Sequence, residues 1–299
     1  MLNRTRCLIC GTDGNKIYSI SYNKNNIRYF FLNYYGNSIK VKKFLQKIKK
    51  YNYDLYKCIN CKFIWQANYL RDKLQNQLYD SIISPNLSLK KSQKTEKKFR
   101  KSFQLNFNFL KQNFKRKKIQ ILDFGAGWGS WISSLKESEK NIFALESSKE
   151  RVRHLKKNKV QIINYKDLIK KNYKFDFIRL EQVLEHIGDL NKTLKILKKI
   201  SKTNTLIYVS VPNSDILFKN KWRDNLLIKG PAQPLEHLNS FTKKSLTKIF
   251  LKFSFKKVSM LFFIKCFFYN KKLDFNNLKI LLKLIINNLI NTSIILRKI

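Results

Sequence analysis

The stretch ILDFGAGWGSW, from Ile121 to Trp131, places three glycines at alternate positions directly after an apolar run that carries an aspartate. Glycine reaches positive φ without strain and lets the backbone approach a ligand closely, so this pattern predicts a strand, a tight turn and a binding site. A dinucleotide fingerprint would need its last glycine at Ser130, and no Gly-Lys-Ser/Thr of a phosphate-binding loop follows. The turn therefore predicts a ligand that is not held by its phosphates.

Around this turn, strand patterns and helix patterns alternate along the chain. The runs IQILDF, NIFALE, VQIIN, FDFIRL and TLIYVSVP predict strands, and WISSLKES, KERVRHLKKN and LNKTLKILKKISK predict helices between them. This alternation predicts an α/β fold with a doubly wound, mainly parallel sheet and helices on both faces. In such a sheet, ligands bind at the carboxyl ends of the strands, where the glycine turn falls.

Four motifs in this order resemble a known family. ILDFGAGWGSW, NIFALESS, FDFIRLEQVLEHIGD and LIYVSVPN resemble the ordered motifs of class I S-adenosylmethionine-dependent methyltransferases, with a Rossmann-like sheet, over about residues 118 to 265. A single glycine motif would be weak evidence, whereas four motifs in the right order are specific. The resemblance implies that the glycine turn wraps the amino acid and ribose parts of S-adenosylmethionine.

The resemblance also carries over to individual positions. Asp123 resembles the acidic residue that organises the turn and the amino end of the cofactor. Glu146, at the end of the second strand, resembles the acceptor for the ribose hydroxyls, and a carboxylate suits two hydroxyl donors because it only accepts. Asp167 stands near the place where the family often contacts adenine, although YKDLIKK departs from the usual pattern. The cofactor-binding residues expected are Asp123, Gly125, Ala126, Gly127, Gly129, Glu146, Asp167 and Gln182.

Two histidines are candidates for a general base. His186 lies in EQVLEHIGD after the fourth strand, and if that segment is helical it shares one face with Gln182. His237 lies in PLEHLNSFT, which resembles a segment of a methyltransferase subgroup common in sugar and polysaccharide pathways. Either imidazole could take a proton from a hydroxyl as the methyl group leaves the sulfonium. A structural hydrogen-bonding role stays equally open for both, and Glu185 is expected to orient its segment.

Two C-x-x-C pairs, Cys7 with Cys10 and Cys58 with Cys61, predict a four-thiolate zinc site. The N-terminus lacks the apolar core of a secretory signal, so a cytoplasmic location is expected and disulfides are disfavoured. Such a site leaves no open coordination position, so the metal would stabilise the module and not catalyse. The resemblance supports this, because methyltransferases with segments like PLEHL often carry an N-terminal zinc-binding segment. The remaining Cys266 is expected to be a buried core thiol.

Four regions are expected along the chain. Residues 1–83, with runs such as NKIYSISY and NIRYFFLNYY, predict a small β-rich, zinc-ribbon-like module. Residues 84–117 combine a polar connector with an amphipathic helix, and 118–265 form the cofactor-binding domain. Residues 266–299 are expected to form an amphipathic helical segment. A helix or strand packed on the main domain is favoured over a helix that lies on a membrane surface.

The chain has 62 Lys and Arg against 19 Asp and Glu, a net charge of +43. This charge would attract nucleic acid or an anionic membrane, but it is spread along a chain rich in Lys, Asn and Ile, so compositional bias is the favoured explanation. The sequence predicts a methyltransferase for a small molecule such as a sugar nucleotide or glycan precursor, with Trp222 and Arg223 in a substrate-side lid. The alternatives are an RNA methyltransferase, disfavoured by LEQV where an Asn-Pro-Pro-Tyr-like motif would stand, and a non-catalytic binding protein.

Overall fold

The computed structural model describes the chain except for residues 115–117, 136–140, 219–229, 269–274 and 290–291. By their contacts, the described residues form two compact units. The first unit comprises Met1–Pro85, Gln182–Thr193 and Val211–Ile249, and the second comprises Asn86–Glu181, Leu194–Ser210 and Phe250–Ile299. The first unit therefore also takes two segments from the region 118–265. None of the described helices is long and apolar enough to cross a membrane.

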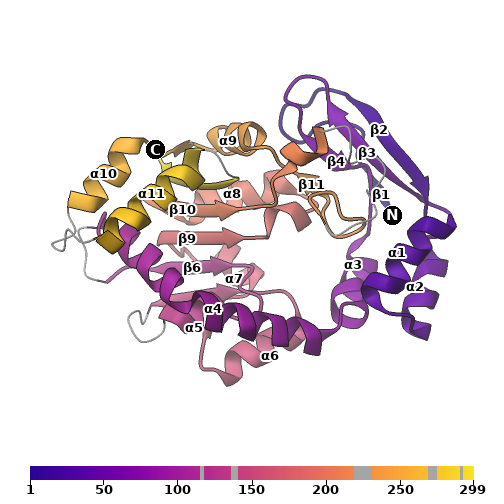
Figure 1. Ribbon diagram of the computed structural model, residues 1–299, viewed down its shortest axis with the longest axis horizontal. Coiled ribbons are helices and arrows are strands. Elements are labelled where there is room, and N and C mark those ends of the chain that lie inside the picture. Colours follow the sequence, from indigo (N-terminus) through magenta and orange to yellow (C-terminus); the bar gives the residue numbers. More distant parts are fainter. Residues whose placement is uncertain (115–117, 136–140, 219–229, 269–274, 290–291) are drawn as a thin grey trace. The chain divides into compact units, whose positions relative to one another are not determined.

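A seven-stranded mixed sheet forms the centre of the second unit, with the strand order β12-β13-β10-β9-β6-β7-β8 (Figure 1). The five strands from β10 to β8 run parallel, and β13 pairs antiparallel with both β10 and β12. This order and direction confirm the predicted α/β methyltransferase fold. The strands are β6 (Ile121–Phe124), β7 (Ile142–Leu145), β8 (Gln161–Ile162), β9 (Phe175–Glu181), β10 (Ser201–Ser210), β12 (Phe255–Lys257) and β13 (Ser293–Lys298).

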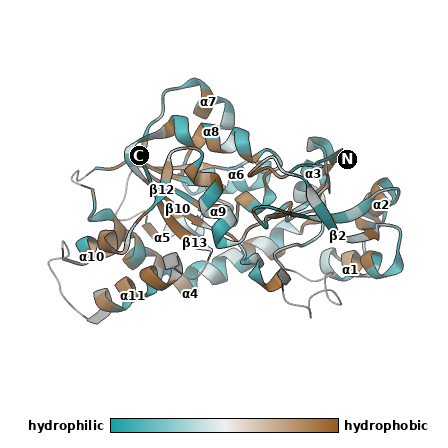
Figure 2. Ribbon diagram, turned by 90° about the horizontal axis from the view of Figure 1, so that it is seen from above, coloured by the Kyte–Doolittle hydropathy of each residue, from teal (hydrophilic) through white to brown (hydrophobic). Residues whose placement is uncertain are grey.

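Helices cover both faces of this sheet, with α4, α10 and α11 on one side and α7 and α8 on the other (Figures 1 and 2). Figure 2 shows apolar and polar residues alternating along α11, as expected for a helix with one face on the core. The three helices predicted between the strands are present as α5, α6 and α8, although the last two residues of LNKTLKILKKISK already belong to β10. Helices α7, α9 and α10 were not predicted. The structure describes eight helices from α4 onward. Their bounds are α4 (Pro85–Lys111), α5 (Ser130–Leu135), α6 (Lys149–Lys157), α7 (Tyr165–Lys170), α8 (Leu190–Ile200), α9 (Lys243–Leu251), α10 (Met260–Phe268) and α11 (Phe275–Leu289).

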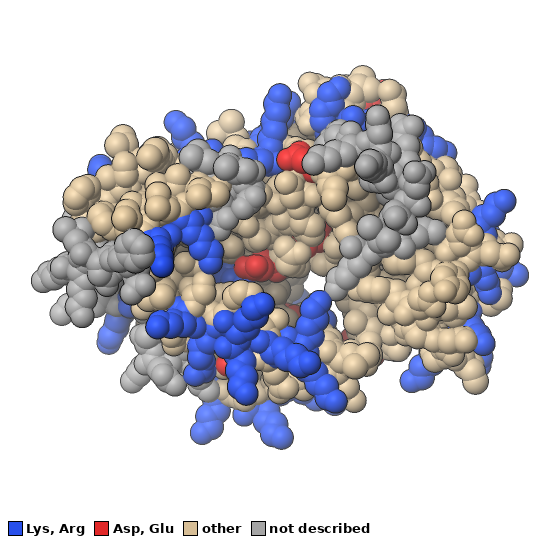
Figure 3. Space-filling model, viewed as in Figure 1, with Lys and Arg blue, Asp and Glu red and all other residues tan. Residues whose placement is uncertain are grey.

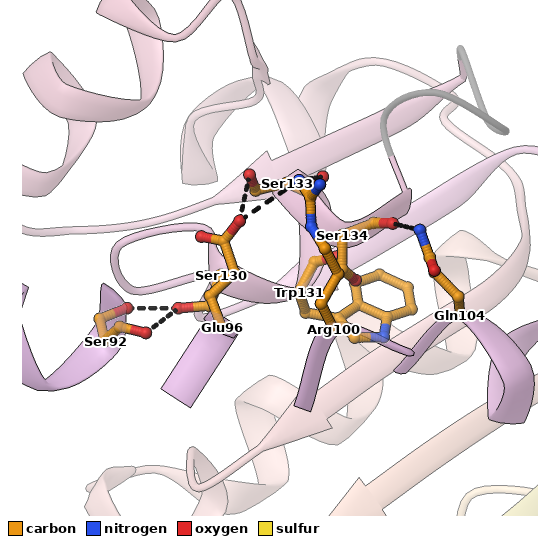
Figure 4. A network of polar contacts seen from close by, with 8 residues as sticks. All are labelled: Ser92, Glu96, Arg100, Gln104, Ser130, Trp131, Ser133 and Ser134. Carbon is orange, nitrogen blue, oxygen red and sulfur yellow. Dashed lines mark hydrogen bonds and ion pairs between the residues drawn. The ribbon is translucent and has the colours of Figure 1, made fainter. Parts of the chain in front are cut away.

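The long helix α4 begins at Pro85, so the stretch expected as a polar connector is helical. Proline suits the first turn of a helix because the missing N–H has no partner there in any case. Polar contacts fix α4 to α5 directly behind the glycine turn (Figure 4). Ser133 Oγ donates to Glu96 Oε1 over 2.8 Å, and Gln104 Nε2 donates to the Ser134 carbonyl over 2.7 Å.

The C-terminal region is helical only in part, because its last residues form strand β13 inside the large sheet. Ile294, Ile295 and Leu296 are all buried between β10 and β12. A run of consecutive apolar residues is typical of a strand that is covered on both faces. The expectation of one amphipathic helix is therefore wrong for this end of the chain.

The first unit contains a four-stranded antiparallel sheet, β11-β4-β3-β2, and a separate pair, β1-β5. The β-rich prediction holds for NKIYSISY but is wrong for NIRYFFLNYY, which forms helix α1. Ile27, Phe30 and Phe31 are buried on one side of this helix at a spacing of three and four residues. The elements are β1 (Leu2–Asn3), β2 (Gly14–Ser21), α1 (Asn25–Tyr35), α2 (Ile39–Ile48), β3 (Asn52–Cys58), β4 (Ile64–Gln66), β5 (Asn68–Tyr69), α3 (Asp72–Gln77), a short π-helix (Leu78–Ile82), two 3₁₀ turns (Leu184–His186 and Ser214–Phe218) and β11 (Asn239–Ser240).

Segments distant in sequence are joined in the first unit by the buried side chain of Gln66. Its Nε2 donates to the carbonyls of Gln233 and His237, each over 2.7 Å, and its Oε1 accepts from the Leu235 N–H over 3.1 Å. One amide group thereby bonds three backbone groups, and the Gln233 carbonyl also accepts from the His237 N–H over 3.1 Å. These contacts fix the backbone from Gln233 to His237.

We expect Gln66→Leu to destabilise the first unit by about 2 kcal/mol, because it removes the acceptor of the Leu235 N–H and a donor to the Gln233 and His237 carbonyls, and one unsatisfied buried group costs about 1–3 kcal/mol. Amide hydrogen exchange followed by mass spectrometry should show β4 exchanging more than tenfold faster. Gln77→Leu is the control, because Gln77 only accepts from Lys47 at an exposed position. Equal exchange in the two variants would contradict the role assigned to Gln66.

Candidate functional site

The turn from β6 to α5 places three glycines at the carboxyl end of the sheet. Gly125, Gly127 and Gly129 have φ values of 79°, 59° and 81°, a region that side chains rarely adopt. A Cβ on Gly127 would meet open space, whereas a Cβ on Gly129 would lie 2.5 Å from Leu155 Cδ2. Gly129 is therefore needed where the turn packs against α6, and Gly127 leaves an uncovered stretch of backbone. These are the properties of a turn that receives a ligand.

The neighbouring strand β7 holds the turn in place. The N–H groups of Gly125 and Ala126 donate to the carbonyl of Leu145 over 2.8 and 3.1 Å. Directly after Leu145, the Glu146 carboxylate accepts from the Gly127 N–H through Oε2 over 2.8 Å. Its Oε1 accepts from the N–H groups of Ser147 and Ser148. A carboxylate offers about four lone-pair positions, so acceptor capacity remains for a ligand hydroxyl.

Asp123, on β6, is buried and belongs to an ionic network that crosses to β9. Its Oδ1 accepts from Arg179 Nη1 over 3.0 Å, and Arg179 Nη2 donates to Glu181 Oε2 over 2.8 Å. Asp123 Oδ2 is buried and has no hydrogen-bond partner among the residues that the structure describes. Burial raises the pKa of Asp123, although the Arg179 guanidinium opposes this shift. An unsatisfied acceptor beside the glycine turn fits a cofactor group that donates hydrogen bonds.

Asp167 and Gln182 lie in less specific surroundings. Asp167 is in the first turn of α7, where its carboxylate accepts from Asn164 Nδ2 and pairs with Lys171. Its adenine contact stays a prediction. Gln182 is exposed at φ 52°, and only the 3₁₀ turn Leu184–His186 follows. It therefore does not share an α-helical face with His186, as it would if EQVLEHIGD were a helix.

The two candidate bases, His186 and His237, meet in the first unit with their ring centroids 4.9 Å apart. His186 Nδ1 lies 2.8 Å from the Glu236 carbonyl, and His237 Nδ1 lies 2.6 Å from the Gly230 carbonyl. A carbonyl only accepts, so a neutral imidazole that donates to it from Nδ1 carries its lone pair on Nε2. The Tyr79 hydroxyl also lies 3.0 Å from His186 Nδ1. The buried Glu185 carboxylate lies 3.9 Å from His186 Nε2. This arrangement fits both a base and a structural cluster, so the catalytic role of each histidine stays a prediction.

All four cysteines predicted as metal ligands lie together, with their sulfur atoms within 4.8 Å of one another. The sulfurs of Cys7 and Cys61 are 3.5 Å apart, and those of Cys10 and Cys58 are 3.4 Å apart. Tetrahedral zinc with bonds of about 2.3 Å would separate its sulfur ligands by roughly 3.8 Å, so the cluster is close to that geometry. The hydrogen bond between Cys7 and Cys61 lowers the pKa of Cys61 to about 5 and raises the pKa of Cys7 far above its usual range, so these two sulfurs share one proton when no metal is bound.

The sequence prediction missed Arg179, which links Asp123 to Glu181. A signal was present, because a charged residue inside the buried strand FDFIRLE needs a carboxylate partner. The partner itself is 56 positions away, so the pattern of the strand alone does not identify it. The predicted lid residues Trp222 and Arg223 lie outside the described residues.

A family model described as "Methyltransferase domain" matches residues 96–260, more than half of the chain. The chain belongs to this family. The matched region contains every cofactor-binding residue named from the sequence, from Asp123 to Gln182, and both candidate bases. It does not include the four-cysteine cluster.

The chain is also similar, at low sequence identity, to individual methyltransferases and related proteins. The ubiquinone biosynthesis O-methyltransferase of Pelagibacter ubique is 28% identical over 108 residues, which are 33% of this chain and 45% of that protein. The chain thus spans less than half of this curated relative. Among solved structures, the plantazolicin methyltransferase BamL is 14% identical, with a TM-score of 0.49 over 75% of this chain and 92% of its own. A cyclopropane synthase from Mycobacterium tuberculosis is 13% identical, with a TM-score of 0.43 over 65% of this chain and 83% of its own.

We expect Glu146→Gln to weaken binding of S-adenosylmethionine at least tenfold, about 1.4 kcal/mol. The amide loses the charge and one of the two acceptor oxygens that hold Gly127, Ser147 and Ser148. Isothermal titration calorimetry with the full-length protein measures the change. Glu150→Gln, an exposed position in the first turn of α6, is the matched control and should bind normally. Unchanged affinity in Glu146→Gln would show that this carboxylate does not contact or shape the site.

Proposed function

We propose that this protein transfers a methyl group from S-adenosylmethionine to a small-molecule acceptor. The observation that carries the proposal is the glycine turn with Glu146 bound to its Gly127 N–H and Asp123 Oδ2 left as a buried acceptor beside it. Membership of the methyltransferase-domain family makes this turn the expected cofactor site.

Each part of the turn would hold a different part of the cofactor. Asp123 Oδ2 suits a donor such as the amino group, and Glu146 suits the ribose hydroxyls, since both are acceptors at the carboxyl ends of adjacent strands. The cofactor, when bound, supplies a methyl group activated by its sulfonium. The protein contributes chiefly by alignment, because methyl transfer requires the attacking atom in line with the bond that breaks.

Deprotonation of the acceptor is assigned to His237, with His186 as the second candidate. The Gly230 carbonyl holds the hydrogen of His237 on Nδ1, which keeps the lone pair on Nε2 for a proton from a hydroxyl group. Gln66 fixes the carbonyl of the same residue, so the imidazole stands on a constrained backbone. A sugar nucleotide or glycan precursor as acceptor rests on the resemblance of PLEHLNSFT.

A second candidate acceptor is RNA, which the exposed basic side chains of α4 favour. Lys90, Lys91, Lys94, Lys97, Lys98, Arg100 and Lys101 are exposed on this helix. Figure 3 shows Lys and Arg side chains gathered over it. Basic charge attracts phosphates without selecting a sequence, so this surface supports binding and not a reaction. The small-molecule acceptor remains the proposal.

The function is tested by transfer of a radiolabelled methyl group to fractions of cell extract, separated into small polar molecules, glycans, lipid-soluble molecules and RNA. We expect label in a small-molecule fraction, and a loss of at least 100-fold in kcat for His237→Asn, the size of a general-base contribution. Asparagine retains an N–H donor for the Gly230 carbonyl, so a purely structural histidine would be largely replaced. Label in RNA alone would contradict a small-molecule acceptor, and no binding of S-adenosylmethionine would overturn the proposal.

We also propose that the four cysteines bind a structural zinc ion. Hydrogen bonds from the N–H groups of Ile9 and Cys61 to the sulfurs of Cys7 and Cys58 support this, because they stabilise thiolates and set the sulfur positions. Four sulfur ligands complete the coordination of zinc, so the ion would connect the Cys7–Cys10 turn to the Cys58–Cys61 turn.

We expect the purified protein to contain one zinc per chain and Cys58→Ser to contain less than a tenth of that, measured by plasma mass spectrometry. Chelation of the wild-type metal should accelerate proteolysis of the first unit, because metal binding and folding are coupled. Cys266→Ala is the control, because this buried thiol of α10 lies in the second unit. Full zinc content in Cys58→Ser would refute the assigned ligand set.

A further inference from the structure

The second unit contains a cavity of about 290 Å³ between α4, α11 and the sheet. The cavity is open to solvent on one side, where the lining residues Phe99 and Lys283 are exposed, so a ligand can enter it. Every lining residue belongs to the second unit. These residues are Thr95, Phe99, Ser102, Phe103, Asn106, Phe107, Leu110, Trp131, Phe177, Arg179, Glu181, Tyr208, Lys283 and Leu284.

Six of the fourteen lining residues are aromatic. Phe107 contacts Trp131 and Phe177 edge to face, with centroids 5.8 and 5.4 Å apart. Trp131 and Phe177 stack with centroids 6.1 Å apart, which fixes three rings into one rigid surface. Such a surface offers apolar area and ring edges to a planar ligand at little cost in side-chain entropy.

At its polar end, the cavity reaches the ionic network beside the cofactor turn. Arg179 and Glu181 line the cavity, and Arg179 also binds Asp123. The Arg179 guanidinium lies 5.0 Å from the centroid of the Trp131 ring, which follows the glycine turn directly. The cavity therefore adjoins the elements that would hold the cofactor within one compact unit.

Charge at this end selects against an anionic ligand. Arg179 donates to the carboxylates of Asp123 and Glu181, and Lys283 is a second cation in the lining, so two positive and two negative charges balance and no positive excess is left for an anion. Glu181 is partly exposed and accepts hydrogen bonds, so it suits a hydroxyl donor. Lys283 also lines the cavity, but its Nζ donates to Ser102 Oγ at an exposed position.

We propose that this cavity binds the methyl acceptor, and that the acceptor is a neutral aromatic molecule whose hydroxyl group donates to Glu181. The inference rests on the proposed methyl transfer, replaces the sugar-linked acceptor by an aromatic one, and gives the contact with the acceptor hydroxyl to Glu181 in place of His237. A diphosphate-linked sugar does not fit this cavity, because among its lining residues Lys283 alone is a cation that no carboxylate pairs with, and the two charges of a diphosphate would otherwise be buried against aromatic rings and Glu181.

Binding of 2-naphthol, a neutral aromatic alcohol, tests the proposal. Calorimetry uses the full-length protein saturated with S-adenosylhomocysteine, the demethylated cofactor. We expect one saturable site that weakens at least tenfold in Asn106→Trp, which fills the cavity, and in the smaller Asn106→Leu. Asn108→Trp is the matched control, because Asn108 is exposed on the same helix two residues away. It should bind like the wild type.

Binding of S-adenosylhomocysteine serves as the internal check. If the wild type and the three variants bind S-adenosylhomocysteine equally, the variants are folded and the cavity is not the cofactor site. If Asn106→Leu no longer binds S-adenosylhomocysteine, the assignment of the cavity to the acceptor is overturned. Absent or variant-independent binding of 2-naphthol would overturn the inference and leave the methyltransferase proposal intact. Uridine diphosphate glucose should show no binding that depends on Asn106, and competition with 2-naphthol would contradict the neutral aromatic class. Failure of the wild type to bind S-adenosylhomocysteine would instead refute the proposed function.

Discussion

The arrangement of the second unit depends on a turn that must cross three positive-φ positions within five residues. Glycine at 125, 127 and 129 makes this path possible, and the last of them also removes the side chain that would collide with Leu155. The carbonyl of Leu145 and the carboxylate of Glu146 then hold the turn against the neighbouring strand. Strand β6, helices α5 and α6 and the cofactor site are thus positioned by one short piece of backbone.

Charge burial is the second constraint on this unit. Arg179 lies in a strand whose neighbours are mostly apolar, and its desolvation is offset by two carboxylates on adjacent strand positions. Burial acts to lower the pKa of Arg179, but Asp123 and Glu181 raise it overall, so the guanidinium stays charged. The same network leaves one oxygen of Asp123 for a ligand and forms the polar end of the aromatic cavity. Stability and ligand selection therefore use the same three side chains.

In the first unit, buried backbone groups come from segments that are distant in sequence, and side chains must supply their hydrogen-bond partners. Arg4 donates to the Gln66 and Leu238 carbonyls and to Asn239 Oδ1, and Gln66 in turn satisfies the backbone around His237. These polar contacts add to the apolar core of the unit, in which residues such as Phe31, Phe44 and Leu55 are buried. The four-cysteine cluster lies in the same unit, and the zinc ion proposed for it would link its two C-x-x-C pairs.

The spacing of residues in the sequence predicted many features of this protein. The glycine turn, Asp123 before it and Glu146 after the next strand follow from one repeated strand-turn-helix pattern, and two C-x-x-C pairs indicate one cluster. NIRYFFLNYY was misjudged because Tyr and Phe favour strands, whereas burial of Ile27, Phe30 and Phe31 on one side selects a helix. No pattern in the sequence showed that C-terminal residues would complete the large sheet as β13.

The sequence by itself determined the alternation of strands and helices, the glycine turn, and the carboxylates and thiols available to a cofactor or metal. Each of these features depends on residues a few positions apart. Only the tertiary structure decided that Arg179 meets Asp123, that His186 meets His237, and that rings from α4, α5 and β9 enclose a cavity. These contacts join residues some 25 to 80 positions apart in the sequence, so they depend on how complete elements pack and not on the local geometry of any one of them.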